Sequence, residues 1–355
     1  MSQTESRKHE HVDISLEKDV NFDHNYWDDI ALKHNALPEV DKEEVDLSSS
    51  LFGKKLSMPL VIAGMTGGYK KAEELNDNLA AAAEEYQVGM GVGSQRAGLE
   101  KSDLNKTYSV IRNYDIPLVF ANIGVSQLVL WDHEKSVEYA NKMMDMVDAD
   151  VLAVCLNFLQ EVVQLEGEAH GYGCLEAIQN LVEDVDFPVL VKESGAGISK
   201  YVAKRLLDAN VAGIDVGGSG GTSFAGIEHY RAKRYDDRLH ARGGKTFWNW
   251  GVPTPISVME VVDVAKDIPV VATGGIRNGL DVAKSLVLGA DAAGVANVFL
   301  KAAAEGKDEI LFELDAFYKE LRAAMFLTGS SDVEQLRGND EWVIDGVKLW
   351  SWKRN

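Results

Sequence analysis

Cysteine is scarce in this chain of 355 residues, which holds Cys155 and Cys174 and no other. Two cysteines make neither a disulfide framework nor a cysteine-rich metal cluster. We therefore expect both to be small buried hydrophobic side chains, in a protein of the reducing cytoplasm.

Basic residues are too few to balance the acidic ones, with 36 Lys and Arg against 56 Asp and Glu and a net charge of −20. A nucleic-acid-binding protein carries a basic stripe, and this sequence shows none, so we expect no nucleic-acid partner. An acidic protein that binds an anionic ligand must gather Arg, Lys and backbone N–H groups locally.

Long hydrophobic runs are also lacking, since no segment approaches the roughly 20 apolar residues of a membrane-spanning helix. The first residues carry charges without an apolar run behind them, unlike a signal peptide. These features predict a cytoplasmic protein with no membrane association.

What the sequence does have is a series of short β-branched runs, each followed by a helical pattern. Continuous apolar strands that alternate with amphipathic helices indicate a parallel sheet covered on both faces. The runs are residues 59–63, 88–92, 117–121, 150–156, 188–192, 212–216, 269–273 and 292–296. Eight such units predict a closed (β/α)8 TIM barrel. An open Rossmann sheet is disfavoured because no GxGxxG follows the first run, which leads into Met65-Thr66-Gly67-Gly68.

The predicted barrel occupies residues 53–327 of one domain that spans residues 1–355. A polar N-terminal extension (1–52) precedes it, and a tryptophan-containing tail (328–355) follows. A long insertion, residues 222–255, separates the sixth and seventh strands, and its Phe-Trp-Asn-Trp segment predicts an ordered, packed region.

Small polar residues and glycines follow every predicted strand, at the barrel end where such enzymes keep their chemistry. The most specific pair is formed by the glycine-rich turns 217–222 and 274–279. Gly274 and Gly275 lead into a helix, so first-turn N–H groups are expected to hold a phosphate. Arg277 either adds charge to that site or is a solvated side chain at the helix start.

Two charged residues at strand ends indicate further chemistry. Lys192 ends an apolar strand on its inward side, and its neighbour Glu193 faces the other way, so a cofactor anion or an electron-rich ring is the better partner. Schiff-base chemistry is the less favoured alternative. Glu161 is either a helix N-terminal acid or a ligand that shares Mg²⁺ with a substrate phosphate.

Taken together, the strand-end segments resemble the type 2, FMN-dependent isopentenyl diphosphate isomerases, from residue 7 to beyond residue 325. The ordered set of matching segments is Arg7-Lys8-x-x-His11, Met65-Thr66-Gly67-Gly68, Gly91-Val92-Gly93-Ser94-Gln95-Arg96, Leu156-Asn157-x-x-Gln160-Glu161, Val191-Lys192-Glu193, Gly220-Gly221-Thr222-Ser223, Gly274-Gly275-Ile276-Arg277-Asn278-Gly279 and Ala323-Ala324-Met325-Phe326-Leu327. Each segment alone is weak, whereas the ordered set is highly specific.

The resemblance implies an isomerase that interconverts isopentenyl and dimethylallyl diphosphate by a flavin-assisted 1,3-proton shift in isoprenoid biosynthesis. It implies FMN reduced by NADPH, Mg²⁺ and a homo-oligomer, a tetramer or an octamer. The implied FMN contacts are Met65, Thr66, Ser94, Asn122, Lys192, Thr222, Gly274, Gly275, Ile276, Arg277, Ala296 and Asn297. The implied substrate contacts are Arg7, Lys8, Ser94, Gln95, Arg96 and Gln160. Gln160 is the implied catalytic residue near the alkene, and Glu161 the implied Mg²⁺ ligand.

Four positions depart from the family pattern, and two other functions remain open. Cys155, Leu165, Ser194 and Phe224 stand where the family usually has His, Pro, Thr and Trp. Cys155 matters most, because the usual His lies close to the flavin. A 2-hydroxy-acid oxidase is the first alternative, although it requires a His and an Arg after the sixth strand. A flavin- or phosphate-binding module without catalysis is the second.

Overall fold

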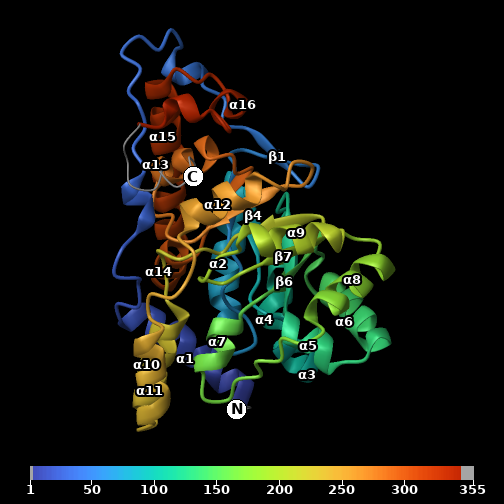
Figure 1. The fold of residues 1–355 in the computed structure, drawn as a ribbon. Coiled ribbons are helices and arrows are strands. Elements are labelled where there is room, and N and C mark those ends of the chain that lie inside the picture. The colour runs from blue at the N-terminus through green and yellow to red at the C-terminus, as the bar shows by residue number, and fades with distance from the viewer. Residues whose placement is uncertain (1–2, 345–355) are drawn as a thin grey trace.

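The computed structural model describes residues 3–344, and within them eight parallel strands close into a barrel (Figure 1). Each strand pairs with the next one along the chain, and the last pairs with the first. The strands are β3 (Leu60–Ile62), β4 (Gly89–Gly91), β5 (Val119–Gly124), β6 (Val151–Cys155), β7 (Val189–Lys192), β8 (Gly213–Asp215), β9 (Val270–Thr273) and β10 (Ala292–Val295). The predicted (β/α)8 barrel is confirmed, with a strand in each of the eight expected places.

The two-residue period of the strands decides which side chains enter the barrel. On β7, Val191 belongs to the core between barrel and helices, whereas Leu190 belongs to the barrel interior. Lys192 is therefore the next inward residue, at the carboxyl end of the strand. The register pairs it with Cys155 on β6 and with Asp215 on β8, so these three side chains lie on the same face.

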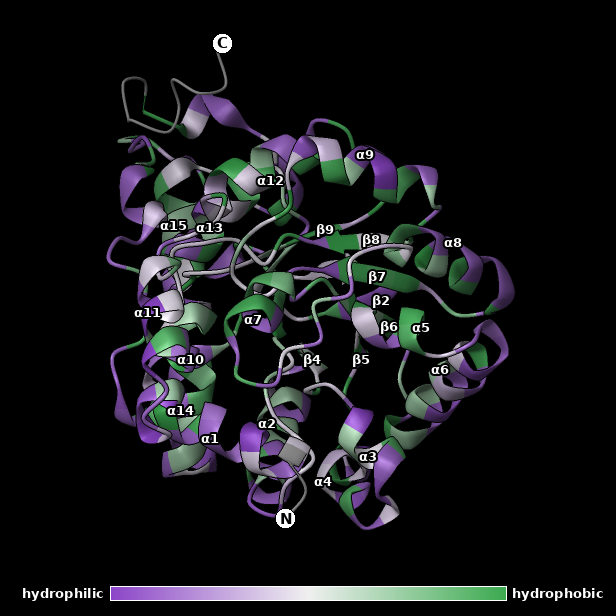
Figure 2. Ribbon diagram, turned by 60° about the horizontal axis from the view of Figure 1, so that its bottom comes forward, coloured by the Kyte–Doolittle hydropathy of each residue, from purple (hydrophilic) through white to green (hydrophobic). Residues whose placement is uncertain are grey.

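Helices surround the barrel, with apolar residues on the strands and polar residues on the outer faces of the helices (Figure 2). The helices after the first are α2 (Ala72–Tyr86), α3 (Arg96–Glu100), α4 (Lys106–Ser109), α5 (Val125–Leu130), α6 (His133–Val147), α7 (Phe158–Val163), α8 (Cys174–Asp184), α9 (Lys200–Asp208), α10 (Phe224–Arg234), α11 (Arg238–Thr246), α12 (Thr254–Val262), α13 (Gly279–Val287), α14 (Asn297–Glu305), α15 (Lys307–Thr328) and α16 (Val333–Leu336). The expected last helix near residue 327 is α15. Of the predicted tail, residues 345–355 lie outside the described residues.

The N-terminal extension is more structured than its polar sequence suggests. It begins with α1 (Gln3–Glu17), which lies beside α10 near the carboxyl end of the barrel (Figure 1). Ile14 of this helix is fully buried against Val20 and Ile227. Because α1 has few apolar residues, its sequence pattern is weak, and only its contact with α10 reveals the buried face.

A two-stranded hairpin closes the opposite end of the barrel. It consists of β1 (Ser49–Leu51) and β2 (Lys54–Leu56), and Leu51 and Leu56 join the interior cluster. The Phe52 ring packs edge-on against Phe120, with centroids 5.9 Å apart. The sequence did not predict this hairpin, because strands of three residues with two lysines have no clear apolar pattern.

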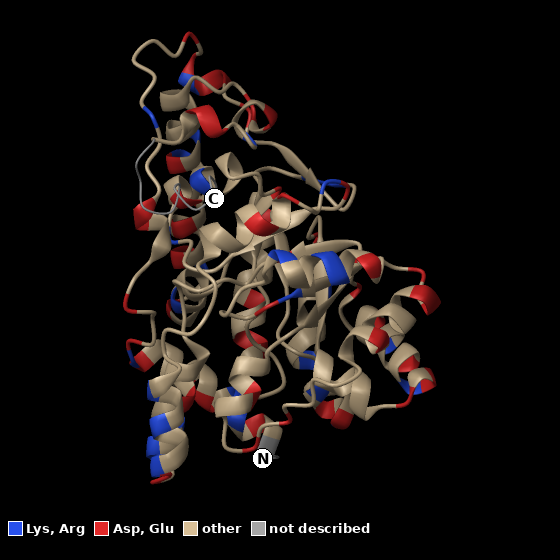
Figure 3. Ribbon diagram, in the orientation of Figure 1, with Lys and Arg blue, Asp and Glu red and all other residues tan. Residues whose placement is uncertain are grey.

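The insertion between the sixth and seventh strands forms an ordered helical arm. Helices α10 and α11 pack side by side, and Trp248 is buried, with its indole N–H donating to Asn21 O at 2.8 Å. The prediction of a packed insertion is confirmed. Figure 3 shows Lys and Arg gathered on this arm, while Asp and Glu are spread over the other helices.

Among the described helices, none is both long and apolar enough to cross a membrane.

The hairpin predicts a stability effect that has nothing to do with catalysis. Leu56 is fully buried at the closed end of the barrel, so Leu56→Ala leaves a cavity there. We expect it to lower the free energy of unfolding by about 2–5 kcal/mol, measured by urea denaturation. Leu37→Ala is the control, because Leu37 is 73% exposed. Equal stability of the two variants would show that the hairpin does not contribute to the core.

Candidate active site

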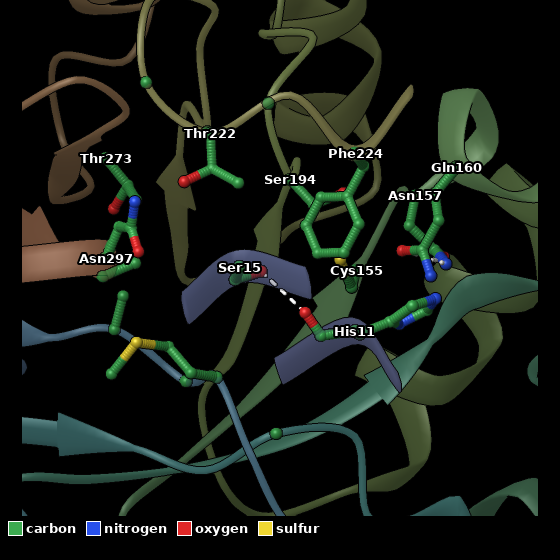
Figure 4. Close-up of a pocket in the computed structure, with 18 of the residues that line it drawn as sticks. His11, Ser15, Cys155, Asn157, Gln160, Ser194, Thr222, Phe224, Thr273 and Asn297 are labelled. Atoms are coloured by element: carbon green, nitrogen blue, oxygen red, sulfur yellow. Dashed lines mark hydrogen bonds between the residues drawn. The ribbon is translucent and has the colours of Figure 1, made fainter. Parts of the chain in front are cut away.

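A cavity of about 580 Å³ opens at the carboxyl ends of the barrel strands, beneath α1 and beside α7. This volume lies in the range typical of ligand sites. In Figure 4, Thr222, Thr273 and Asn297 lie on one side of it, and Asn157 and Gln160 on the other. The predicted site residues that line it are Arg7, Lys8, Met65, Thr66, Ser94, Arg96, Asn122, Gln160, Glu161, Lys192, Thr222, Gly274, Gly275, Ile276, Arg277, Ala296 and Asn297.

Gln95 is the one predicted site residue that does not line this cavity. It is fully buried, its amide donates to Met143 O at 2.8 Å, and its Oε1 accepts the Asn122 N–H at 2.9 Å. Its side chain thus links the end of β5 to helix α6. The placement does not support the expected contact of Gln95 with substrate; it supports a structural role in holding Asn122.

The glycine turn after β9 is oriented by the N-terminal extension. The Trp27 indole donates to Gly274 O at 2.9 Å, and the Asn25 amide donates to Gly275 O at 2.7 Å. In a trans peptide the N–H points opposite to the C=O. The N–H groups of Gly275 and Ile276 therefore point away from these two donors, and both residues line the cavity. Left-handed φ angles at Gly274 (123°) and Gly275 (74°) make this turn possible.

Arg277 has partners of its own beside this turn. Its guanidinium lies 2.5 Å from Asp28 Oδ1 and 3.1 Å from Asp281 Oδ2. Hydrogen bonding from Arg277 lowers the pKa of Asp28. The side chain joins the short helix η1 (Tyr26–Asp29) to α13, so its expected contact with an FMN phosphate stays a prediction.

Three buried polar atoms at the strand ends have no hydrogen-bond partner among the described residues: Asn122 Oδ1, Thr273 Oγ1 and Asn297 Oδ1. All three residues line the cavity. Buried polar atoms without partners are rare in native proteins, unless a ligand or water satisfies them. Together with the oriented glycine turn, they fit a polar heterocycle carrying one phosphate, such as FMN.

Lys192 reaches the cavity floor as a charged group. Its ammonium lies 2.9 Å from Glu193 O and 3.6 Å from Cys155 Sγ. Burial lowers the pKa of Lys192, but Cys155, Asp215 and Glu193 outweigh burial and raise it above its ordinary value. The Glu193 carboxylate instead accepts backbone N–H groups, including that of Ser194 at 2.6 Å. Lys192 therefore carries a positive charge that can interact with a bound ring.

The two cysteines differ in environment. Cys174 is buried, as expected, whereas Cys155 is only partly buried and lines the cavity, so the expectation of a buried hydrophobic side chain is wrong for Cys155. Burial raises the pKa of the Cys155 thiol despite the nearby Lys192 ammonium. Cys155 is thus a neutral thiol near neutral pH.

Cations gather at the mouth of the cavity. Lys8 donates to Gly67 O at 3.1 Å, to the Tyr108 hydroxyl at 2.9 Å and to Ser94 O. Burial, together with the positive charges of Arg7 and Arg96 and against the opposing effect of Glu100, lowers the pKa of Lys8 to about 7. A cluster of cations with a lowered lysine pKa is a site that an anion stabilises.

Gln160 and Glu161 occupy the first turn of α7. Asn157 Nδ2 donates to Glu161 Oε1 at 2.9 Å, and the Glu168 N–H donates to Glu161 Oε2 at 2.8 Å. The Gln160 amide lies 3.5 Å from both Asn157 and Gln164. Glu161 is half-buried with one face in the cavity, which suits both a helix-start acid and a metal ligand.

The sequence analysis gave no role to several residues that shape this site. They are Asn25, Trp27, Glu168 and Glu228, and His11 and Asn157 were quoted only as parts of motifs. Arg96 is bound by Glu168 at 2.5 Å, and His11 Nε2 lies 2.6 Å from Glu228 Oε1. These contacts join segments far apart in the chain, and no local pattern in the sequence marks them.

Comparison with known proteins shows both the broad class of enzymes to which the chain belongs and its narrower family. It belongs to the FMN-dependent dehydrogenase family, which matches residues 3–107 and 159–343. It shares its fold with mandelate oxidase solved with benzoyl-formic acid, at 19% identity, 92% coverage of each chain and a TM-score of 0.60.

Within that class, the chain belongs to the isopentenyl-diphosphate delta-isomerases. It is 46% identical to the enzyme of Methanopyrus kandleri over 348 residues, covering 97% of this chain and 93% of the relative. It is 44% identical to that of Archaeoglobus fulgidus, covering 98% of both chains. It is 43% identical to that of Thermoplasma acidophilum, covering 97% and 98%.

The lowered pKa of Lys8 predicts a pH dependence of anion binding. An anion favours the protonated ammonium, so binding takes up a proton above the free-protein pKa of about 7 and weakens as pH rises. The extra loss is at most about tenfold per pH unit. We expect affinity for inorganic pyrophosphate, measured calorimetrically on FMN-loaded protein, to fall more steeply in the wild type than in Lys8→Met. Because pyrophosphate ionises in the same way in both titrations, the difference between the two proteins isolates the contribution of Lys8. Parallel pH profiles would contradict the placement of Lys8 in the anion site.

Proposed function

We propose that this protein interconverts isopentenyl diphosphate and dimethylallyl diphosphate by a flavin-assisted 1,3-proton shift, in isoprenoid biosynthesis. The observation that carries the proposal is the identity of 40–46% over nearly the whole chain to relatives named isopentenyl-diphosphate delta-isomerase. The cavity supports it, because the glycine turn in its lining offers N–H groups to one phosphate and the cations at its mouth can bind a further anionic group.

In this proposal the glycine turn and the unpartnered polar atoms hold FMN. The N–H groups of Gly275 and Ile276 receive the phosphate, while Asn122 and Asn297 face the ring system. The remaining expected contacts are Met65, Thr66, Ser94, Lys192, Thr222, Gly274, Arg277 and Ala296. Reduced FMN supplies the proton donor and acceptor for the allylic shift.

The side chains around the ring set its electrostatics and orient the alkene. The raised pKa of Lys192 keeps a positive charge on the cavity floor, which favours an electron-rich ring. Cys155 stays a neutral thiol and does not act as a base. Gln160, on the opposite wall, is the residue that we assign to the position near the alkene.

The diphosphate is assigned to the mouth, where Arg7, Lys8, Arg96 and Ser94 line the cavity. Glu161 is the proposed Mg²⁺ ligand. Among residues 3–344, no group of three or more His, Cys, Asp or Glu side chains could hold a metal ion. A single carboxylate is compatible with Mg²⁺, which commonly takes one or two carboxylates and completes its shell with phosphate oxygens and water.

The proposal extends to the cofactor supply and to the state of the protein. NADPH is the proposed reductant of FMN, and a cytoplasmic tetramer or octamer built from one barrel domain per chain is the proposed assembly. The acidic composition, with no basic stripe, supports the absence of a nucleic-acid partner.

A 2-hydroxy-acid oxidase is the alternative that the shared fold with mandelate oxidase raises. Such chemistry needs a base and a cation to take the proton and hold the carboxylate of the substrate. The segment after β8 is instead Gly217-Gly218-Ser219-Gly220-Gly221, which has neither. The strand-end chemistry therefore favours the isomerase, and the fold alone does not decide between them.

The decisive test is turnover by purified protein. We expect yellow protein that releases FMN on denaturation and that converts isopentenyl diphosphate to dimethylallyl diphosphate only when the flavin is reduced. Product is measured by chromatography, and 2-hydroxy acids serve as the competing substrates. Flavin binding without turnover of either substrate would support a non-catalytic module, and colourless protein that takes up no FMN would refute the proposal.

The assignment of Glu161 to Mg²⁺ predicts a specific defect in Glu161→Gln. The variant keeps the shape and removes the charge, so we expect Mg²⁺ affinity to fall by about tenfold or more, on the order of 1.4 kcal/mol. The measurement is isomerase rate against Mg²⁺ concentration at fixed substrate. FMN content should stay normal, because the glycine turn lies on a different wall. Overlapping Mg²⁺ titrations would leave Glu161 as a helix-start acid.

A further inference from the structure

Arg231 of α10 joins three carboxylates from three parts of the chain. It is 4% exposed, and its Nε lies 2.6 Å from Glu10 Oε2 of α1. Its Nη1 and Nη2 bind both oxygens of Glu166, at 2.8 and 2.7 Å. Glu228, one turn earlier on α10, lies 3.3 Å from Nη1. Because the guanidinium binds Glu166 through two nitrogens and also contacts Glu10 and Glu228, it strongly constrains how these three side chains lie relative to one another.

The segments that Arg231 joins are those that carry the proposed diphosphate site. Helix α1 carries Arg7 and Lys8, and Glu166 belongs to the loop 164–173 between α7 and α8. Glu168 of the same loop binds Arg96 at 2.5 Å and accepts the Gln127 amide at 2.9 Å. One buried arginine is thus linked, through α1 and through this loop, to all three cations at the mouth.

The position of α1 depends strongly on this ionic contact. Few apolar side chains of the helix are buried, among them Val12 and Ile14. Removal of Arg231 would leave the buried Glu228 carboxylate and the partly buried Glu10 and Glu166 carboxylates without their shared cation, an arrangement that disfavours the packed state. The helix and the loop would then be held to α10 less tightly, with contacts such as that of His11 with Glu228 remaining for α1.

We propose that Arg231 is a positioning residue, which holds α1 and loop 164–173 across the cavity mouth so that Arg7, Lys8 and Arg96 converge on one polyanion. The identity of that polyanion as a diphosphate rests on the proposed function. Arg231 itself does not line the cavity. Its effect is to pre-organise the anion site, and so it acts on binding rather than on the chemical step.

The test compares Arg231→Met with Arg234→Met in the FMN-loaded, full-length protein. Arg234 is the matched control, because it joins the same two helices through Glu17 at 3.3 Å, but in an exposed pair. In Arg231→Met we expect faster amide hydrogen exchange in α1. Affinity for inorganic pyrophosphate should weaken by about tenfold to a hundredfold, and the KM for isopentenyl diphosphate should rise in parallel. FMN affinity and kcat should change by less than about twofold, and Arg234→Met should resemble the wild type.

Glu166→Gln keeps the proposal testable if Arg231→Met does not fold. It removes the negative charge of the loop and leaves the ion pair between Arg231 and Glu10. Affinity for pyrophosphate should therefore fall, while amide hydrogen exchange in α1 should change little. A folded Arg231→Met with normal α1 exchange and normal pyrophosphate affinity would overturn the proposal, as would a folded Glu166→Gln with normal affinity. If wild-type protein binds pyrophosphate but does not isomerise the substrate, the proposed function fails while the positioning role is still decided by these measurements.

Discussion

Carboxylates exceed basic side chains by 20 in this chain, yet its cavity must hold ligands that carry several negative charges. That electrostatic constraint explains much of the site. The proposed phosphate site at the glycine turn after β9 offers backbone N–H groups, which bind an anion without needing a cation that a carboxylate could neutralise. Arg277, the nearest candidate cation, is in fact paired with Asp28 and Asp281. At the mouth, Lys8 contacts oxygen acceptors but, within residues 3–344, no carboxylate, whereas Arg96 is already paired with Glu100 and Glu168.

The N-terminal extension lines the candidate active site as well as adding to the barrel. Through Trp27 and Asn25 it turns the carbonyl groups of the glycine turn away from the cavity. Lys284 of α13 in turn donates to Trp27 O at 2.7 Å, which fixes the extension to the helix that the turn begins. Through α1 the same extension covers the opposite side of the cavity. Both proposed ligand subsites are therefore built partly from residues that lie outside the (β/α)8 repeat.

The shared barrel with mandelate oxidase shows how little of the function resides in the fold. What differs is the set of residues that follow the strands. A glycine run after β8 leaves space and N–H groups where an oxidase would need a base and a cation. Cys155 on β6 places a neutral thiol beside Lys192, and the lysine keeps its charge because Asp215 in the next strand opposes the cost of burial.

The sequence by itself determined the barrel, its eight strands and most of the cavity lining, because each of these follows from local order along the chain. Strand period places Lys192 inward, and parallel strands bring every carboxyl end to one rim, so residues as distant as Thr66 and Asn297 could be placed together. Helix α1, the hairpin that contains Leu56, the internal role of Gln95 and the Arg231 cluster were decided only by tertiary structure. Arg231 lies 65 residues from Glu166 and 221 residues from Glu10 in sequence, and each of the three is an ordinary polar residue in its own segment. Their pairing depends on burial and on the exclusion of water, which arise only when the three segments pack against one another.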